Sequence, residues 1–260
     1  MVNTSGSGIG GAGAASGEDS GKPAGGAPGP SIRTRRFVDR AELTEALASR
    51  LERALVGAGV QSAPAVMLTG GETPIPAYLA LARRAPRPAP GIVVLYSDER
   101  YVPADSDASN YHQSRPLLDA LALAPEQVLR VKTELPLAEA TADYDRALAA
   151  LEGRGTRIGL ALLGLGANGH IASLFNAQDL ERAQGRRAIS VHRPDGRDAV
   201  SVTPQVLERA QEILFAVAGA AKRPALAALL AHGPDLTAWR ALSGCRSIEV
   251  WADREALPDT

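Results

Sequence analysis

The sequence AVMLTGGETPIPAYLALARR, residues 65–84, decides the fold. Its first four residues, Ala65–Leu68, form a short apolar run, which predicts a buried strand. Polar and glycine residues follow from Thr69 to Pro74, and the apolar spacing of Ile75–Arg84 then predicts a helix. A strand that leads directly into a helix is the repeating unit of a parallel sheet, so this stretch predicts an α/β protein.

The same alternation recurs along the chain. Short apolar runs predict further strands at Ile92–Tyr96, Ile158–Leu163, Ile213–Val217, Ala188–Val191, Val200–Val202 and Ile248–Trp251. Helical spacing predicts helices over Ala138–Leu151 and Lys222–Ala231. The expected fold class is α/β, with a mostly parallel sheet flanked by helices, although the sequence does not reveal the order of the strands.

A further helix is expected to begin after Asp39. Asp39 and Glu42 have the spacing of a capping box, and Gly57 and Gly59 end the run. Between these limits leucines recur at every fourth position, namely at Leu43, Leu47, Leu51 and Leu55. This spacing predicts an amphipathic helix that packs one face against the sheet.

The chain is expected to divide into a tail and one domain. Residues 1–30 hold ten of the 26 glycines and only three large apolar side chains, too few to offset the entropy of ordering the segment. We therefore expect a flexible, disordered Gly/Ala/Ser-rich tail over residues 1–30 and a single α/β domain over residues 31–260.

Composition and charge exclude several classes of protein. The chain carries 28 Lys and Arg against 29 Asp and Glu, so it lacks the basic excess of a nucleic-acid or anionic-membrane binder. No apolar run approaches the roughly 18–20 residues of a membrane helix, and the single cysteine, Cys245, cannot form an intramolecular disulfide. Motifs for zinc or serine-hydrolase chemistry are absent from the sequence. We expect a cytoplasmic monomer that binds a small molecule and holds no metal.

Candidate chemistry lies in the loops that follow the strands, because ligands of open α/β sheets bind at the carboxyl ends of the strands. In the first loop, Gly70 and Gly71 allow close backbone approach, Thr73 can cap the helix and Pro74 suits its first position. The free amides at this helix N-terminus predict a phosphate cradle. An ordinary strand-to-helix turn would explain the same residues.

The second loop begins Ser97-Asp98-Glu99-Arg100. Asp98 and Glu99 could serve as a base and its orienting partner, and Arg100 could clamp an anion. A solvated group of surface charges is the alternative. Near the start of a later helix, Lys222 could add a point charge to a phosphate, or it could be an ordinary surface lysine.

The third loop reads GLGANGHIASLF over residues 164–175. Its glycines match the G-x-G-x-x-G dinucleotide pattern, but no carboxylate lies about 20 residues further on, which argues against a nucleotide. The glycines instead leave space around His170, which can accept a proton from water near neutral pH. A histidine that only caps a helix is the alternative.

Together these segments resemble the 6-phosphogluconolactonase family, within the larger group that includes glucosamine-6-phosphate deaminases. The matching motifs follow one another in the same order and spacing as in that family, over about residues 37–255. They are Gly70–Pro74, Asp98–Arg100 with Val102-Pro103 and Ser109–Tyr111, Gly164–Gly166 with Gly169–Phe175, Gly219 with Lys222, and Trp251–Asp253. The resemblance implies a Rossmann-like sheet. It also implies hydrolysis of 6-phosphoglucono-1,5-lactone to 6-phosphogluconate in the oxidative pentose phosphate pathway, without metal, nucleotide or other cofactor.

The resemblance suggests a role for each candidate residue. His170 would act as general base on the attacking water, and Asp98 would hold sugar hydroxyls or assist His170. The phosphate would be bound by Gly70, Gly71, Thr73, Arg100 and Lys222, with Arg197 as a second guanidinium. Asn168 stands where family members commonly have Asp, so it would orient His170 without a full negative charge and would lower its pKa. Asn176 follows Phe175 where proline is usual.

Three other functions remain open. A glucosamine-6-phosphate deaminase usually has a glutamate a few residues beyond the histidine, whereas the first acid after His170 is Asp179. A sugar-phosphate-binding protein without catalysis would also suit Asn168 and the tail. A nicotinamide- or flavin-dependent enzyme would use the glycine-rich loop.

Overall fold

The computed structural model describes residues 29–57 and 65–258. The predicted tail therefore lies outside the described residues, except for Gly29 and Pro30. Pro30 is buried, and Gly29 packs against the ring of Trp239, so the chain is already in contact with the domain at these two residues. Gly59, the second glycine expected to end the first helix, also falls outside the described residues.

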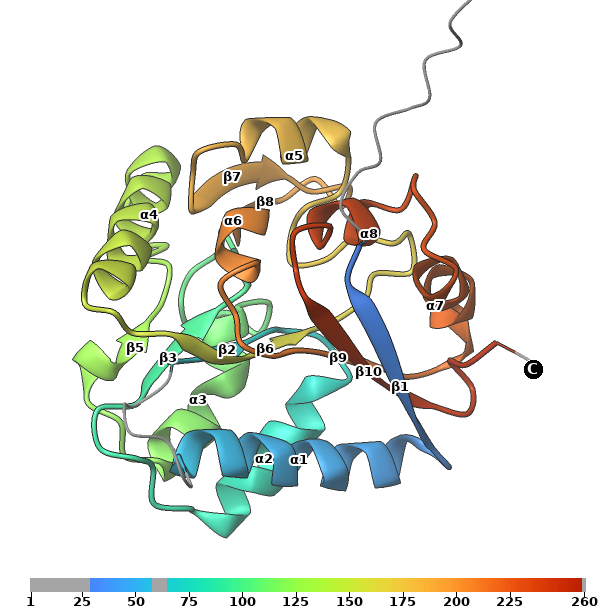
Figure 1. Cartoon of the computed structure of the whole chain (residues 1–260). Coiled ribbons are helices and arrows are strands. Elements are labelled where there is room, and N and C mark those ends of the chain that lie inside the picture. The colour runs from blue at the N-terminus through green and yellow to red at the C-terminus, as the bar shows by residue number, and fades with distance from the viewer. Residues whose placement is uncertain (1–28, 58–64, 259–260) are drawn as a thin grey trace, which may run out of the picture.

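The main sheet has seven strands, and every neighbouring pair is parallel. This confirms the predicted α/β class and shows the strand order (Figure 1). In spatial order the strands are β1 (Ser31–Phe37), β10 (Ser247–Asp253), β9 (Ile213–Val217), β6 (Ile158–Leu163), β2 (Ala65–Leu68), β3 (Val93–Tyr96) and β5 (Val128–Leu129).

Helices cover both faces of this sheet (Figure 1). One face carries α1 (Arg40–Val56), α2 (Pro74–Arg84) and α3 (Asn110–Ala120). The other carries α4 (Leu137–Gly153), α5 (Ala177–Arg182), α6 (Pro204–Leu207), α7 (Arg223–Leu230) and α8 (Thr237–Ala241). Two short 3-10 turns, η1 (Pro125–Gln127) and η2 (Ala220–Lys222), join these elements.

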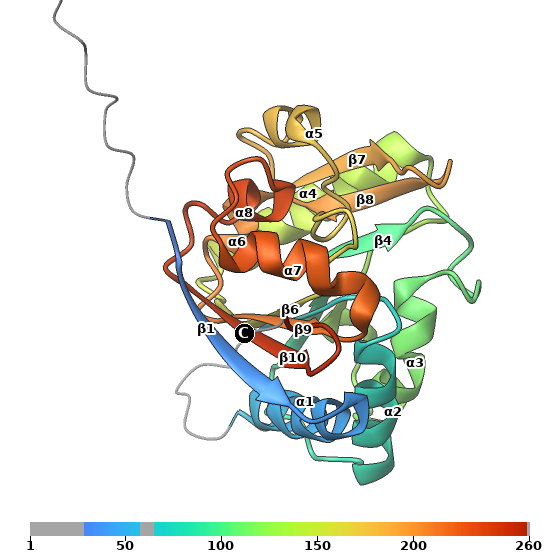
Figure 2. The same ribbon diagram turned by 90° about the vertical axis from the view of Figure 1, so that its right-hand side faces the viewer.

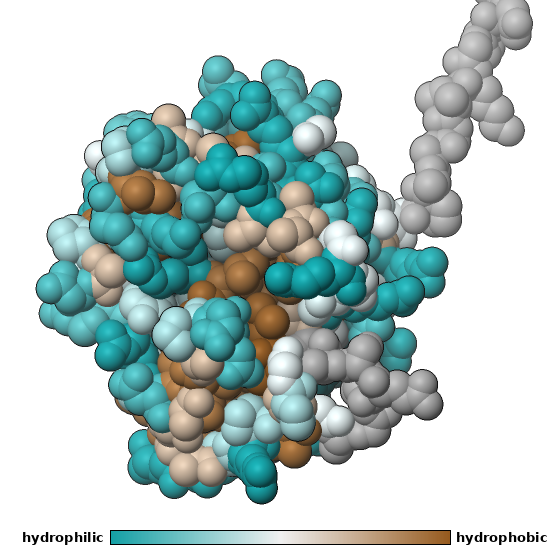
Figure 3. Space-filling model, turned by 90° about the vertical axis from the view of Figure 1, so that its left-hand side faces the viewer, coloured by the Kyte–Doolittle hydropathy of each residue, from teal (hydrophilic) through white to brown (hydrophobic). Residues whose placement is uncertain are grey.

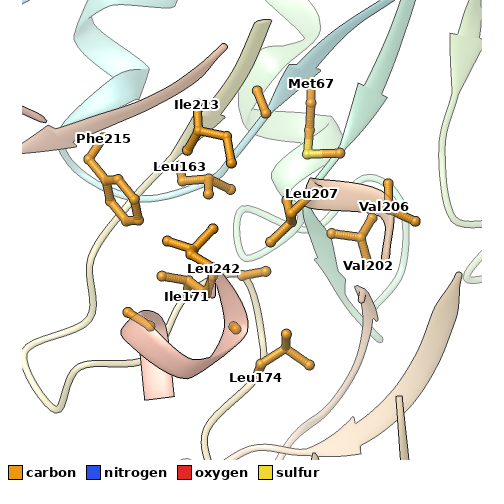
Figure 4. Close-up of a cluster of buried hydrophobic side chains, with 14 of the residues drawn as sticks. Met67, Leu163, Ile171, Leu174, Val202, Val206, Leu207, Ile213, Phe215 and Leu242 are labelled. Carbon is orange, nitrogen blue, oxygen red and sulfur yellow. The ribbon is translucent and has the colours of Figure 1, made fainter. Parts of the chain in front are cut away.

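Each face of the sheet has its own apolar core. Alternate residues of a strand point to opposite faces, so in β6 Leu160 and Leu162 join the core under α1, while Ala161 and Leu163 join the other. Figure 4 shows the second core, in which Leu163 and Phe215 of the sheet face Ile171 and Leu242. Because both faces are buried, the inner strands β2, β3, β6 and β9 read as largely apolar runs, whereas the exposed edge strand β1 does not.

A second, antiparallel sheet lies beside the first (Figure 2). It consists of β4 (Asp98–Arg100), β8 (Asp198–Val202) and β7 (Ala188–His192), in that order. The sequence predicts strands near the last two but treats Asp98–Arg100 as a loop. The pairing of this triplet with Ala199–Ser201 makes it a strand and buries Asp98 and Glu99, which are 4% and 2% exposed. The alternative of solvated surface charges is therefore wrong for these two carboxylates.

Two helix ends show how local chemistry sets the boundaries. The Glu42 N–H donates to Asp39 Oδ1 (2.9 Å), which confirms Asp39 as the N-cap of α1. Glu42 Oε2 accepts from the Val38 N–H (2.7 Å) rather than from the Asp39 N–H, so the reciprocal bond of the predicted capping box is shifted by one residue. The helix expected from Lys222 begins instead at Arg223, after the turn η2. Pro224 lacks an N–H and fits only the first turn of a helix, so it fixes this start.

Over residues 29–57 and 65–258, no helix combines the length and apolar character required to cross a lipid bilayer.

Candidate active site

The loops after β2, β3, β6 and β9 meet around one cavity of about 360 Å³. Its position at the carboxyl ends of the strands is where open α/β sheets bind ligands. Seven of the nine predicted site residues line it, namely Gly70, Gly71, Thr73, Asp98, Arg100, His170 and Lys222. Segments that are far apart in the sequence therefore line one cavity.

The other two predicted residues lie elsewhere. Asn168 is exposed and is not part of the cavity wall, but its Oδ1 is hydrogen-bonded to His170, which is. Arg197 is exposed in the turn between β7 and β8 and is not part of the cavity wall, whereas Arg193 is. Arg40 also lines the cavity. Neither arginine was predicted from the sequence. Arg40 follows the parallel strand β1 by three residues, so the strand-end rule could have found it, whereas Arg193 follows β7 of the antiparallel sheet, to which that rule does not apply.

The loop after β2 presents unused hydrogen-bond donors. Within the described residues, no hydrogen bond uses the backbone N–H groups of residues 70–73. Thr73 occupies the N-cap position of α2 with helical backbone angles, but its side chain makes no capping bond, contrary to the expected role. Tyr78 fixes the start of the loop, because its hydroxyl donates to the Thr69 carbonyl (2.7 Å). Free amides at a helix N-terminus can bind an anion, and residues 70–73 are called the cradle below.

Positive charge surrounds the cradle. Arg40, Arg100, Arg193 and Lys222 line the cavity. Arg100 is held by a bond from Nη1 to the Ala108 carbonyl (2.9 Å), and its buried Nε has no acceptor among the described residues. Arg193 donates from Nη1 to Ser173 Oγ (3.0 Å). Burial lowers the pKa of Lys222, and the nearby Glu72 partly opposes this shift.

The imidazole of His170 is held in a defined orientation. Its Nδ1 lies 2.5 Å from Asn168 Oδ1, and its ring contacts Phe175 at 4.4 Å between centroids. A carbonyl oxygen accepts, so Nδ1 carries the hydrogen and Nε2 keeps its lone pair. The contact that was expected between Asn168 and His170 is thus present, and the tautomer is the one that a general base needs.

The environment of His170 keeps it neutral. Burial lowers the pKa of His170 to about 4, helped by the charges of Arg193, Lys222 and Arg100 and opposed by Asp98. Burial and the neighbouring cations cause this lowering. The effect expected of Asn168 in place of Asp is a separate comparison and stays a prediction. His170 is therefore unprotonated at neutral pH and can accept a proton, although its basicity is weak.

The lowered pKa of His170 makes stability depend on pH. An unfolded imidazole titrates near 6.5, and the folded one near 4. Below pH 6.5 the unfolded chain binds a proton that the folded chain does not, so stability is lost as the pH falls toward 4. The wild type should therefore lose free energy of unfolding between pH 7.5 and 5. We expect His170→Gln to lose about 1 kcal/mol less over this range, after allowance for partial exposure, which corresponds to roughly 2–4 °C in Tm.

Thermal unfolding of the wild type and His170→Gln at both pH values measures this difference. His192→Gln, which replaces an exposed histidine outside the cavity wall, is the matched control. An identical pH dependence for the wild type and His170→Gln would show that the folded histidine titrates normally.

Asp98 faces the cavity from β4 and is fixed on both oxygens. The hydroxyl of Ser97 donates to Oδ1 (2.9 Å), and the hydroxyl of Ser173 donates to Oδ2 (2.7 Å). Asn110 Nδ2 donates to the Asp98 carbonyl (2.8 Å) and lies 3.4 Å from Oδ1. None of its hydrogen bonds within the described part of the chain reaches His170. Its influence on that imidazole is electrostatic, and it favours the protonated form.

A larger cavity, of about 590 Å³, lies at the opposite end of the sheet. It opens near Ile158, Ile213 and Ser247, where β6, β9 and β10 begin. Figure 3 shows this side of the molecule, with an apolar centre surrounded by polar groups. The Glu152 carboxylate in its wall is paired with Arg187 and Arg209. None of the predicted site residues reaches it, so size alone does not identify the site.

Known proteins resemble this chain over the segments that line the cavity. Residues 38–246 match the family model described as glucosamine-6-phosphate isomerases/6-phosphogluconolactonase. A 6-phosphogluconolactonase from Thermotoga maritima is 35% identical over 173 residues, which cover 65% of this chain and 76% of that protein.

Solved structures show the same fold. The crystal structure of the 6-phosphogluconolactonase from Thermotoga maritima superimposes with a TM-score of 0.71 at 26% identity, covering 86% of this chain and 100% of that one. A monomeric glucosamine-6-phosphate deaminase also reaches a TM-score of 0.71, at 18% identity over 86% of this chain and 98% of that one, which shows a shared fold alone. The predicted resemblance is confirmed, and this chain belongs to the family of glucosamine-6-phosphate isomerases and 6-phosphogluconolactonases.

Proposed function

We propose that this protein is a 6-phosphogluconolactonase, which hydrolyses 6-phospho-D-glucono-1,5-lactone to 6-phosphogluconate. One observation carries the proposal. Among the described residues, a neutral histidine whose Nε2 makes no hydrogen bond faces the same cavity as several cations and the unpaired backbone amides of residues 70–73. The amides and cations suit a phosphate, and the histidine suits activation of water.

In the proposed reaction, His170 Nε2 removes a proton from water as the water oxygen attacks the lactone carbonyl carbon. The cations around the cavity stabilise the negative charge that develops on the carbonyl oxygen, and Asp98 stabilises the imidazolium. The C1–O5 bond then breaks, the imidazolium returns its proton to the ring oxygen, and the resulting acid ionises to a carboxylate. A lactone is reactive, so an oriented base and a few donors are sufficient.

The phosphate is proposed to bind the amides of residues 70–73, with Lys222 as a point charge and Arg100 as a guanidinium donor. The nearness of Lys222 to this loop is supported by the charge of Glu72 acting on it. The second guanidinium assigned to Arg197 from the sequence is supplied in this proposal by Arg193, which lines the cavity.

Two of the alternatives lack support in the site. A deaminase needs an acid shortly after the histidine, but Asp179 is buried, accepts a hydrogen bond from the Phe175 N–H (2.9 Å) and does not line the cavity. A dinucleotide needs the space beside the central glycine of the loop. That space beside Gly166 holds His170, whose Nδ1 would be 2.0 Å from an added Cβ.

The test follows the decay of 6-phosphogluconolactone generated in situ, with and without protein, because spontaneous hydrolysis sets the baseline. We expect the protein to accelerate the decay severalfold or more at micromolar concentration and to release no ammonia from glucosamine 6-phosphate. An unchanged decay combined with a Tm raised by 6-phosphogluconate would instead identify a binding protein without catalysis. Ammonia release would identify a deaminase.

A further inference from the structure

Glu99 is a buried carboxylate that the proposed mechanism does not use. It is 2% exposed, and its side chain is not part of the cavity wall. It accepts four hydrogen bonds, from the N–H groups of Arg100 (2.8 Å), Asn110 (2.7 Å) and Tyr111 (2.8 Å) and from the hydroxyl of Ser109 (3.1 Å). This one side chain therefore fixes both the end of β4 and the first turn of α3.

The residue that Glu99 places most directly is Asn110, which is also 2% exposed. Its Nδ2 donates to the Asp98 carbonyl (2.8 Å). Its Oδ1 has no hydrogen-bond partner among the described residues and lies against Gly70, where an added Cβ would come within 1.7 Å. Asn110 thus touches the anion cradle with one end of its amide and the Asp98 strand with the other.

We infer that Glu99 and Asn110 are positioning residues, which set the cradle and Asp98 at the separation that a sugar phosphate requires. The inference rests on the proposed function. A substrate held at its phosphate by residues 70–73 must present its other end to Asp98 and His170. Because Asn110 fills the space between Gly70 and Asp98, the size and placement of its amide determine that distance.

A double-mutant cycle on Gly70 and Asn110 tests this contact. The three atoms nearest an added Gly70 Cβ are Oδ1, Cγ and Nδ2 of Asn110, and Asn110→Ala removes all three. We expect Gly70→Ala alone to raise KM about 10- to 100-fold, as the cradle is pushed away. In the Asn110→Ala background, Gly70→Ala is expected to raise KM by less than about threefold. Equal costs in both backgrounds would overturn the inference.

Glu99→Gln tests the carboxylate with little change in size. In the wild type, both carboxylate oxygens accept hydrogen bonds from backbone N–H groups. In the variant, one of these oxygens is replaced by an NH2 group, which cannot accept, so Asn110 should shift. We expect kcat/KM to fall about 10- to 100-fold, with changes in both kcat and KM. Ser109→Ala is the matched control, because it removes a donor to Glu99 and the N-cap of α3 but leaves the bonds to Asn110.

The control separates positioning from stability. We expect Ser109→Ala to lower Tm while kcat and KM stay within about twofold of the wild type. Loss of activity in Glu99→Gln and Ser109→Ala in proportion to their loss of Tm would overturn the positioning role, as would unchanged kinetics in Glu99→Gln.

Phosphate binding distinguishes this inference from the proposed function. The Kd of inorganic phosphate is measured for the wild type, both single variants and the double variant. A wild type that binds phosphate but does not hydrolyse the lactone contradicts the proposed function alone, and the cycle in Kd still tests the contact. Additive changes in Kd contradict the positioning role alone. A wild type that neither hydrolyses nor binds phosphate contradicts both.

Discussion

Replacement of His170 by glutamine is expected to reduce kcat for 6-phosphogluconolactone by 100- to 10,000-fold, the range that general-base catalysis supplies. Glutamine keeps a similar length and a polar end but cannot accept and return a proton. The side chain is only partly buried and packs against Phe175 at the cavity, so the fold should survive the change. The measurement is the enzyme-dependent decay of lactone over the spontaneous rate, with His192→Gln as the control.

The pH profile provides an independent check on the same histidine. The pKa of His170 is lowered to about 4, so kcat/KM should stay nearly constant from pH 7.5 to 5.5 and fall as the pH approaches 4. A rate that declines already around pH 6.5 would show that the catalytic imidazole is not desolvated. Full activity in His170→Gln would remove it from the mechanism, while inorganic phosphate binding should persist because the cradle is intact.

The fold could be predicted from the sequence because a parallel sheet that is covered on both faces leaves clear patterns. Ala65–Leu68 and Ile213–Val217 are entirely buried and read as unbroken apolar runs. Asp98–Arg100 could not be recognised as a strand, because a three-residue polar segment has no periodicity. Its strand conformation depends on pairing with β8, about 100 residues later in the chain.

Some residues of the candidate site could be predicted from the sequence and others could not. The loops after strands were found because strand ends of a parallel sheet converge at one edge. That Arg193 rather than Arg197 lines the cavity could not be predicted from sequence, since both lie in the turn between β7 and β8 and their placement depends on how these two strands pair. Likewise, Glu99 and Asn110 are adjacent only because α3 folds back on β4, with hydrogen bonds across 11 residues of sequence.

The glycine-rich loop yields a second large expected effect. Gly166 lies beneath the imidazole, and an added Cβ would be 2.0 Å from His170 Nδ1, 2.2 Å from Cε1 and 2.8 Å from Asn168 Oδ1. The Gly166 N–H also donates to the His170 carbonyl (2.9 Å), so the backbone holds the two residues together. Gly166→Ala must therefore move the imidazole away from Asn168. A displacement of about 1 Å can cost 100-fold in rate, and we expect kcat to fall by at least that factor.

Gly164→Ala, two residues earlier in the same loop, is the matched comparison, because no atom lies within 4 Å of its added Cβ. Its methyl group leaves the contact between His170 and Asn168 unchanged, so the loss in kcat should be at least ten times smaller than for Gly166→Ala, and the effect of a methyl group in the cavity wall should appear in KM. Steady-state kinetics and Tm are measured for both variants. Equal losses would mean that the loop needs glycine for its flexibility. A large loss confined to Gly166→Ala, with Tm close to that of Gly164→Ala, would mean that this glycine exists to make room for the base.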